Sequence, residues 1–387
     1  MKVLIFCNRM PDLSGAFFHD VELGKELVKR GHMVVFLSIK ISPQGVNGGT
    51  YRGFRFMHYS AASSFLDTSD IWITPHAPAL PEVRALNARG YNRPIVATCH
   101  YDGNYRTITR NGGTGWTEML LFINEIMESN YRNNITPWPR QIVRTGAVRP
   151  ILHAEEVVIP DPFEGDCITL VNANQNKGVM QFLELARRMP DRKFLGVLPY
   201  YGELAVPLAP ANVRWVPFAD DIREVLKQTR ILLMPSFYES YGRIGIEAMV
   251  NGIPVIYSRP VKNNEFPYGT TQGMIAWAGD IAIQCDREVP EQWVSAITSL
   301  DDPNAYSDLS GRCKDHIAAL DVFSEGPKLA TLIESFSREN PVVIRQTQPT
   351  TAQSQKQEVR PVVLGMSREP KGPVGFGFAN GRLRIQR

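Results

Sequence analysis

The chain has 387 residues and a net charge of +3, and its 43% apolar content is enough for two or three domains with real cores. Five scattered cysteines without metal-ligand spacing predict neither disulfides nor a metal site. No apolar run approaches the ~20 residues of a membrane span, and Met1-Lys2 leads directly into an apolar segment, so we expect neither span nor leader and a cytoplasmic location.

The first part of the chain alternates between apolar strand-like runs and longer helical segments. The predicted strands are 3–6, 33–37, 54–58, 71–74, 95–99 and 155–159, and the predicted helices are 17–30, 80–89 and 118–127, the last after a Gly-rich loop at 103–115. A strand, a helix and a second strand at the start of a chain are typical of a parallel, doubly wound α/β sheet.

A second alternation begins at Ile168, without any sequence repeat that can be aligned with the first. Strands are predicted at 168–171, 194–198, 213–216, 230–236 and 254–257, and helices at 178–189, 220–228, 244–250, 291–300 and, with breaks, 304–336. We therefore predict two α/β domains, 1–160 and 161–339.

The remainder, 340–387, differs in composition from the two predicted domains. It contains eight Lys or Arg and two Glu, a net +6, so residues 1–339 carry −3. Its composition shifts toward Gln, Thr, Pro and Ser, which predicts a basic flexible tail with a disordered linker at 345–375. Its last segment is either a short docking strand or simply tail.

The most informative segment places Glu239 in a loop after a predicted strand and Glu247 inside the following helix. Gly242 allows close approach of the backbone, and the N–H groups of Gly242, Arg243 and Ile244 would face an anion at the helix start. Carboxylates beside an anion site suit sugar and ribose hydroxyls, which need acceptors. The segment therefore indicates a nucleotide-sugar site, although either Glu alone is equally typical of an ordinary helical surface.

The same segment contains Pro235-Ser236, Glu239, Tyr241-Gly242, Glu247-Ala248-Met249 and Gly252-Ile253-Pro254-Val255. This resembles the Glu-x7-Glu signature of retaining glycosyltransferases of family four. The resemblance implies the GT-B fold, two facing Rossmann-like domains, with 1–160 on the acceptor side and 161–339 binding the nucleotide-sugar. It also implies that Glu239 contacts hydroxyls of the transferred sugar and Glu247 the ribose diol.

The resemblance extends to four further positions of the expected donor site. Lys177, before Gly178, would clamp the diphosphate, but Asn172 stands where the family has a basic residue. Arg243 would then supply the missing charge, and Gly15 in the first strand–helix loop would approach the donor phosphates. Solvated surface positions or a simple turn are the alternatives for Lys177 and Gly15.

His100 follows the predicted strand 95–99, and the carboxyl end of a parallel strand opens toward the cleft of such folds. The resemblance places it near the transferred sugar, so the expected catalytic set is His100, Glu239 and Lys177. A buried structural histidine is the alternative. Asp102 could bind acceptor hydroxyls, or it is simply the turn residue before Gly103. Glu265 lies in a loop where the family often has an acidic residue, and the sequence assigns no role to His19.

The resemblance implies a metal-independent reaction. No Asp-x-Asp motif occurs, and Asp220-Asp221 and Asp301-Asp302 suit helix caps. Lys177, Arg243 and the helix start would neutralise the departing diphosphate of the donor, for which UDP is the expected nucleotide, and no other cofactor is implied. The alternatives are a nucleotide-sugar epimerase or phosphorylase and a catalytically degenerate GT-B protein used in binding or assembly.

The acceptor is not identified by any motif. A basic tail on an acidic body suits a polyanionic partner, such as modified DNA, an anionic glycan or an anionic membrane surface. A solvated tail without a specific partner is the alternative, because no aromatic residues interleave with its basic ones.

Overall fold

The computed structural model describes residues 1–10, 15–41, 48–75, 79–101, 105–199, 209–263, 266 and 269–342, together with the backbone of 206–207, 376–379 and 382–385. The chain divides into a body, residues 1–202 and 209–342, and a small unit of residues 203–208 and 343–387.

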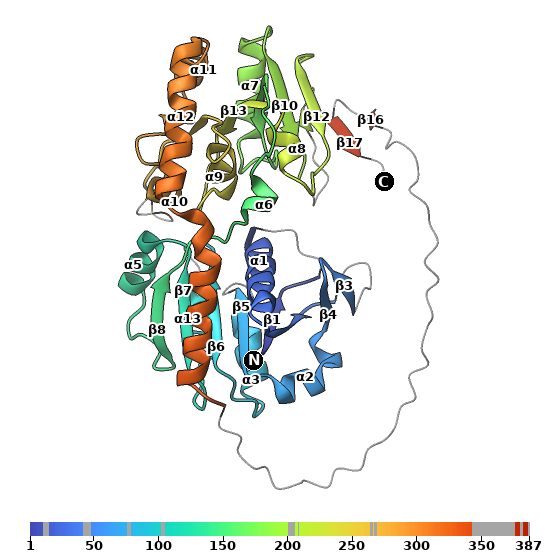
Figure 1. Cartoon of the computed structure of the whole chain (residues 1–387), viewed down its shortest axis with the longest axis vertical. Coiled ribbons are helices and arrows are strands. Elements are labelled where there is room, and N and C mark those ends of the chain that lie inside the picture. Colours follow the sequence, from blue (N-terminus) through green and yellow to red (C-terminus); the bar gives the residue numbers. More distant parts are fainter. Residues whose placement is uncertain are drawn as a thin grey trace. The chain divides into compact units, whose positions relative to one another are not determined.

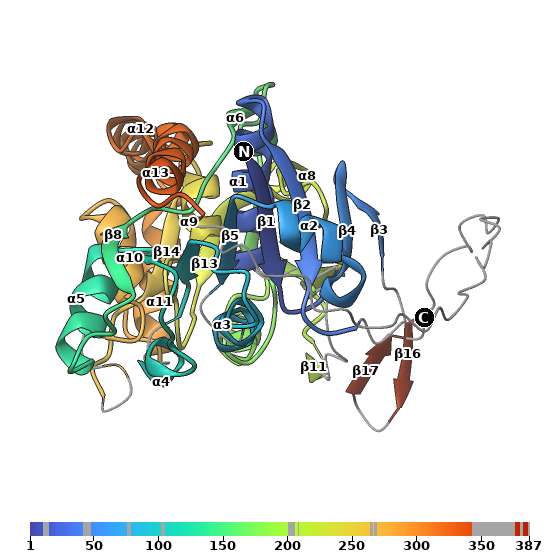
Figure 2. The same cartoon turned by 90° about the horizontal axis from the view of Figure 1, so that it is seen from below.

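The first sheet of the body has the strand order β3-β4-β2-β1-β5-β6-β7-β8 among the described residues (Figures 1 and 2). Neighbouring strands are parallel except β3, which pairs antiparallel with β4 at one edge. The strands are β1 (Lys2–Cys7), β2 (Met33–Ser38), β3 (Gly48–Tyr51), β4 (Phe54–His58), β5 (Ile71–Pro75), β6 (Ile95–Cys99), β7 (Glu118–Phe122) and β8 (Ile142–Ala147).

Helices connect these strands, as parallel pairing requires. They are α1 (Gly15–Lys29), the 3-10 turn η1 (Tyr59–Ala61), α2 (Ser63–Thr68), α3 (Leu80–Asn87), α4 (Tyr105–Thr109), α5 (Glu125–Asn134) and α6 (Ala154–Val157). Central strands are buried on both faces and are correspondingly rich in Val, Ile, Leu and Phe.

The second sheet has the order β12-β10-β9-β13-β14-β15, and all its neighbours are parallel. Its strands are β9 (Cys167–Leu170), β10 (Lys193–Val197), β12 (Val213–Val216), β13 (Thr229–Met234), β14 (Val255–Ser258) and β15 (Ile283–Cys285). The helices are α7 (Val179–Arg188), α8 (Arg223–Leu226), α9 (Arg243–Met249), α10 (Gln272–Ala278), α11 (Pro290–Ser299), α12 (Pro303–Ala319), the turn η2 (Val322–Ser324) and α13 (Glu325–Glu339).

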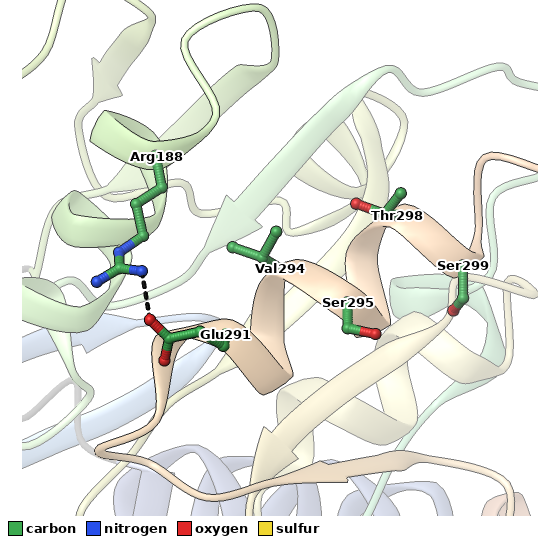
Figure 3. Close-up of a pocket in the computed structure, with 6 residues that line it drawn as sticks. All are labelled: Arg188, Glu291, Val294, Ser295, Thr298 and Ser299. Carbon is green, nitrogen blue, oxygen red and sulfur yellow. Dashed lines mark hydrogen bonds and ion pairs between the residues drawn. The ribbon is translucent and has the colours of Figure 1, made fainter.

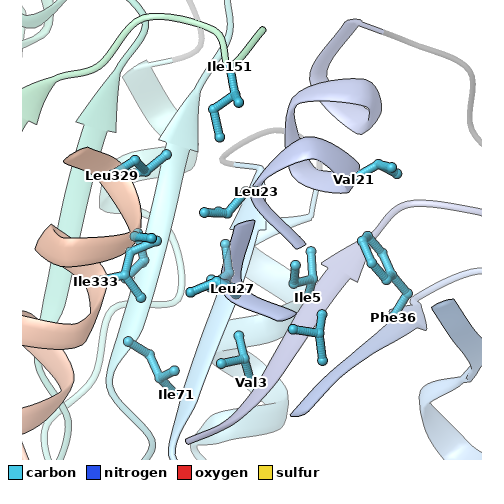
Figure 4. Close-up of a cluster of buried hydrophobic side chains, with 14 of the residues drawn as sticks. Val3, Ile5, Val21, Leu23, Leu27, Phe36, Ile71, Ile151, Leu329 and Ile333 are labelled. Carbon is cyan, nitrogen blue, oxygen red and sulfur yellow. The ribbon is translucent and has the colours of Figure 1, made fainter. Parts of the chain in front are cut away.

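The final helix, α13, packs into the core of the first sheet although it follows the second sheet in the chain. Leu329 and Ile333 of α13 belong to one buried cluster with Leu23 and Leu27 of α1 and with side chains of β1 (Figure 4). The range 161–339, predicted as one domain, thus ends in a helix that belongs to the packing of the first sheet.

Two predicted elements are wrong. The stretch predicted as a helix over 118–127 is strand β7, all five residues buried between β6 and β8, followed by α5, whose first turn is capped by Asn124. The stretch predicted as a strand over 155–159 is instead the short helix α6. Its acidic first turn favours a helix start, and Glu156 is held by Lys25 of α1.

The helix cap predicted at Asp302 is confirmed. Asp302 is the N-cap of α12, its side chain accepting from the Asn304 backbone N–H, whereas the N-cap of α8 is Ile222, with Asp221 before it accepting from the Arg223 N–H. All five cysteines are buried thiols outside any disulfide. Among the residues described, no helix is long and apolar enough to cross a membrane.

The small unit contains three short strands in the order β11-β17-β16, paired antiparallel. They are β11 (Val206–Pro207), β16 (Phe376–Ala379) and β17 (Arg382–Ile385). The chain end therefore forms strands, one of the two outcomes the sequence left open. The predicted linker at 345–375 lies outside the described residues, and the domain limits at 160 and 340 stay predictions.

Candidate functional site

The topology of the second sheet places two loops side by side. Strands β9 and β13 are neighbours in the sheet. The chain continues from β9 to β10 on one side of this pair and from β13 to β14 on the other side. Such a switch point opens a crevice at the carboxyl ends of the strands. The loop after β9 carries Lys177, and the loop after β13 carries Glu239.

Lys177 and Glu239 form an ion pair in this crevice. The Lys177 Nζ lies 2.6 Å from Oε1 of Glu239, and the Ser236 hydroxyl donates to the same oxygen at 2.8 Å. Glu239 is only 5% exposed. Its Oε2 has no hydrogen-bond partner among the described residues, so this oxygen can accept from a ligand hydroxyl.

The backbones of the two loops are locked together. Gly178 has φ +80°, and a Cβ there would lie 2.1 Å from the Pro235 carbonyl oxygen, so only glycine fits. The Phe237 N–H donates to the Asn176 carbonyl at 2.7 Å, and the Asn176 amide donates to the Tyr238 carbonyl at 3.3 Å. Lys177 and Glu239 are therefore presented by one rigid framework.

Asn172, the residue in place of a family cation, is exposed and lies in the same loop with φ +60°. Its Oδ1 accepts from the Asn174 amide at 3.1 Å. It contributes no charge, whereas Lys177 and, at the start of α9, Arg243 are cations.

Glu247 and Arg243 form the second ion pair, within α9. Gly242 is the N-cap at φ +79°, Arg243 and Ile244 are in the first turn, and Arg243 Nε donates to Glu247 Oε1 at 2.6 Å. Trp277 of α10 closes the other side of this turn, with its ring where a Cβ of Gly245 would be. The seven-residue helix thus presents both side chains on one face, one turn apart.

Arg243 also influences α1 of the first sheet. Its positive charge contributes to lowering the pKa of His19, after burial and the neighbouring His100, and to lowering the pKa of Glu22. The start of α9 and the middle of α1 are therefore electrostatic neighbours. The sequence assigned His19 no role. Its position one turn beyond the β1 loop is the signal that could have identified it as a residue near the candidate site.

His100 follows β6 and lies beside His19, the ring centroids 5.2 Å apart and the planes inclined by 69°. Burial lowers the pKa of His100 to about 4, so its ring is neutral near pH 7. Its Nε2 is buried without a hydrogen-bond partner among the described residues. Gly15 begins α1 with open space around it, whereas Asp102 and Glu265 lie outside the described residues.

Two contacts join the His100 end of the first sheet to the Glu239 end of the second. The ring of Tyr101, next to His100, lies 4.8 Å from that of Tyr238, next to Glu239. The Asn124 amide donates to the Ser240 carbonyl at 3.0 Å. The body thus brings His100 and the two Glu–cation pairs to one region, although they come from different sheets.

Other hollows of the body lie apart from these residues. One is a shallow surface depression over α7 and α11, crossed by the 2.6 Å ion pair of Arg188 and Glu291 (Figure 3). Another, of about 240 Å³, is lined by Asn124, Arg149, Tyr241 and α13 residues. Neither is lined by Lys177, Glu239 or Glu247.

A family model and one curated relative each match part of the chain. Residues 207–265, which include Glu239, Arg243 and Glu247, match the family model described as "Glycosyl transferases group 1". Over 129 residues the chain is 26% identical to D-inositol 3-phosphate glycosyltransferase of Corynebacterium kroppenstedtii, covering 32% of this chain and 26% of that protein. The match thus spans about a quarter of that relative's length.

Three solved structures show the same architecture at low sequence identity. HepE of Anabaena, solved with UDP-glucose, has a TM-score of 0.68 at 12% identity, covering 87% of this chain and 100% of that one. Sucrose-phosphate synthase of Thermosynechococcus elongatus has a TM-score of 0.61 at 13% identity, and the match covers 88% of this chain and 99% of that one. WaaG, a glycosyltransferase involved in lipopolysaccharide biosynthesis, has a TM-score of 0.61 at 13% identity, and the match covers 86% of this chain and 99% of that one. The body has the GT-B fold, as predicted, with two parallel-sheet α/β domains.

Proposed function

We propose that the chain is a retaining glycosyltransferase that moves a sugar from a nucleotide-diphosphate sugar, with UDP as the nucleotide, to a hydroxyl acceptor. The observation that carries the proposal is the pair of ion pairs, Lys177–Glu239 and Arg243–Glu247, at the switch point of the second sheet. Each joins a carboxylate suited to hydroxyls with a cation suited to phosphate, as one nucleotide-sugar requires.

Donor binding would exchange the partners within these pairs. In the structure each cation neutralises its own carboxylate at 2.6 Å. A diphosphate entering the crevice would draw Lys177 and Arg243 toward its oxygens, because phosphate is the more highly charged anion. Glu239 and Glu247 would then accept hydrogen bonds from the sugar and the ribose, so each carboxylate keeps hydrogen-bond donors after its cation has turned to the diphosphate.

The reaction would proceed without a metal ion. Lys177, Arg243 and the first turn of α9 would neutralise the diphosphate as it leaves. Attack would occur on the face from which the diphosphate departs, which retains the anomeric configuration, and the diphosphate would help deprotonate the acceptor hydroxyl. His100 would contact the transferred sugar. HepE, solved with UDP-glucose, supports UDP as the nucleotide.

Calorimetric titration and thermal shift with UDP, GDP, ADP and their common sugars test the donor site. We expect selective UDP binding, weakened about tenfold or more in Glu247→Ala, because the variant loses an acceptor and leaves Arg243 unpaired. Glu224→Ala, an exposed helical Glu paired with Lys227, is the matched control and should bind like the wild type. If no nucleotide binds, the transferase proposal fails.

Retention and metal independence are tested separately. NMR of the product anomer tests whether the configuration is retained, and activity in EDTA tests whether the reaction needs a metal ion.

Arg243 makes a separate prediction. Arg243→Gln should raise the donor KM about tenfold, since Asn172 supplies no replacement charge. Steady-state kinetics with varied donor measure this, and an unchanged KM would remove Arg243 from the phosphate site. Arg214→Gln, an exposed residue of the edge strand β12, serves as the control.

The acceptor is proposed to be polyanionic, modified DNA or an anionic glycan, held by the basic segment 340–387. Deleting residues 345–387 should abolish transfer to such an acceptor while donor hydrolysis continues. Transfer that survives the deletion would assign the tail no docking role. The cytoplasmic location also stays a prediction.

A second candidate is a degenerate GT-B protein that binds or assembles without catalysis. The uncharged, exposed Asn172 favours it, because one cation of the family's diphosphate clamp is missing. Nucleotide binding without turnover on any acceptor would support this candidate over the transferase. An epimerase remains the alternative enzyme and would interconvert two sugars of one nucleotide.

A further inference from the structure

Three potential metal ligands meet where α1 passes the end of β6. His19 and Asp20 are adjacent in α1, and His100 follows β6 directly. Each offers one ligand atom, and these atoms all lie within 4.8 Å of one another. His19 and Asp20 are each 1% exposed, whereas His100 is partly accessible and provides a route to solvent.

The histidines of this cluster lack the partners that buried polar groups normally have. Both ring nitrogens of His19, and Nε2 of His100, are buried without a hydrogen-bond partner among the described residues. An unsatisfied buried nitrogen destabilises the fold, so such atoms usually face a ligand. One such nitrogen from each histidine, beside the Asp20 carboxylate, points to one ligand shared by the three residues.

We propose that His19, Asp20 and His100 bind one divalent transition-metal ion of the Zn²⁺ class. Two imidazoles and one carboxylate with open positions are a common metal-binding set. Zn–N bonds of about 2.1 Å place tetrahedral ligand atoms about 3.4 Å apart, so the side chains would close by roughly 1 Å. The ion would cross-link α1 to β6 and raise the stability of the first domain.

The charge around the cluster is mixed. Arg243 acts on His19 and opposes a cation there. Its own ion pair with Glu247, at 2.6 Å, and the nearby Glu22 reduce this opposition. Asp20 supplies the negative charge within the set. No step of the proposed sugar transfer uses the ion, but His100 belongs to both proposals, so the test is a metal-binding measurement that does not depend on transfer activity.

Titration of EDTA-treated, untagged protein with Zn²⁺, in the absence of nucleotide, tests the site. We expect one ion per chain, a higher thermal midpoint, and visible absorption bands when Co²⁺ replaces Zn²⁺. His19→Ala and Asp20→Asn should each weaken Zn²⁺ binding about tenfold or more, because each removes one of three ligands. His58→Ala is the control, since its ring is held by Ser60 and by the Ile39 carbonyl outside the cluster.

The proposal is overturned if the wild type binds no stoichiometric ion, or if both cluster variants bind Zn²⁺ as tightly as the wild type does. Circular dichroism establishes that each variant folds. If His19→Ala does not fold, Asp20→Asn decides, because it keeps the shape of the side chain and removes only its charge.

Discussion

Gly178 shows how a single residue fixes the geometry of the crevice. Its left-handed backbone turns the loop after β9 so that Lys177 reaches Glu239, and the Pro235 carbonyl occupies the space a Cβ would need. Any larger residue must both strain the backbone and separate the two loops. The position is therefore constrained by conformation and by packing at once.

Gly178→Ala should lower the free energy of unfolding by about 2–4 kcal/mol, combining left-handed strain of roughly 1 kcal/mol with the clash. Gly31→Ala is the matched control, since Gly31 has φ +83° with open space around it. Denaturant unfolding of both variants separates the two contributions. Equal losses would show that the Pro235 contact is unimportant.

At the level of elements, burial overrides local pattern. The run Glu118–Phe122 carries a helix-compatible pattern, yet it lies between β6 and β8. Its single charge is satisfied in the core, because Glu118 pairs there with Arg84 at 2.5 Å. A short apolar run suits a buried strand and a buried helix equally well, so only the neighbouring strands decide between them.

Helix α13 follows the second sheet in the chain but packs in the core of the first. Ile333→Ala should lower the free energy of unfolding by about 2–5 kcal/mol, because Ile333 is fully buried among first-sheet residues. Arg338→Ala, exposed on the same helix, should change it by less than about 0.5 kcal/mol. A small effect of Ile333→Ala would mean that α13 is not part of that core.

For the whole molecule, an ionic network ties α1 to the segment that leads into the second sheet. His153 Nε2 lies 3.1 Å from Glu22 Oε2, and Lys25 contacts both Glu22 and Glu156. Glu22 raises the pKa of His153, outweighing burial and the opposing charge of Lys29. Burial alone would raise the pKa of Glu22, but His153 and Lys25 together lower it.

This pair makes stability depend on pH in a defined direction. The His153 contribution is present below its ordinary pKa of about 6.5 and is lost as the pH rises through the raised value. The Glu22 contribution is present above about 4.5 and is lost as the pH falls through the lowered value. The pair therefore stabilises the fold most between these limits.

Between pH 6 and pH 9 the free energy of unfolding should fall by on the order of 1 kcal/mol less in His153→Gln than in the wild type, because the variant has no imidazole to deprotonate. Denaturant unfolding across this range measures it, with His58→Gln, a partly buried histidine outside the network, as the control. The same pH slope in His153→Gln and in the wild type would exclude the network as its source.

The sequence by itself determined what local spacing can determine. Strand, Gly and helix signals within a dozen residues place Glu239 in a loop and Glu247 one helical turn beyond Arg243. The α/β class follows from signals of the same kind. The tertiary structure decided which distant residues meet. Lys177 pairs with Glu239 across 62 positions, and His19 meets His100, because strand order brings their loops together. Strand order depends on packing energies summed over whole sheets, which no short stretch of sequence encodes.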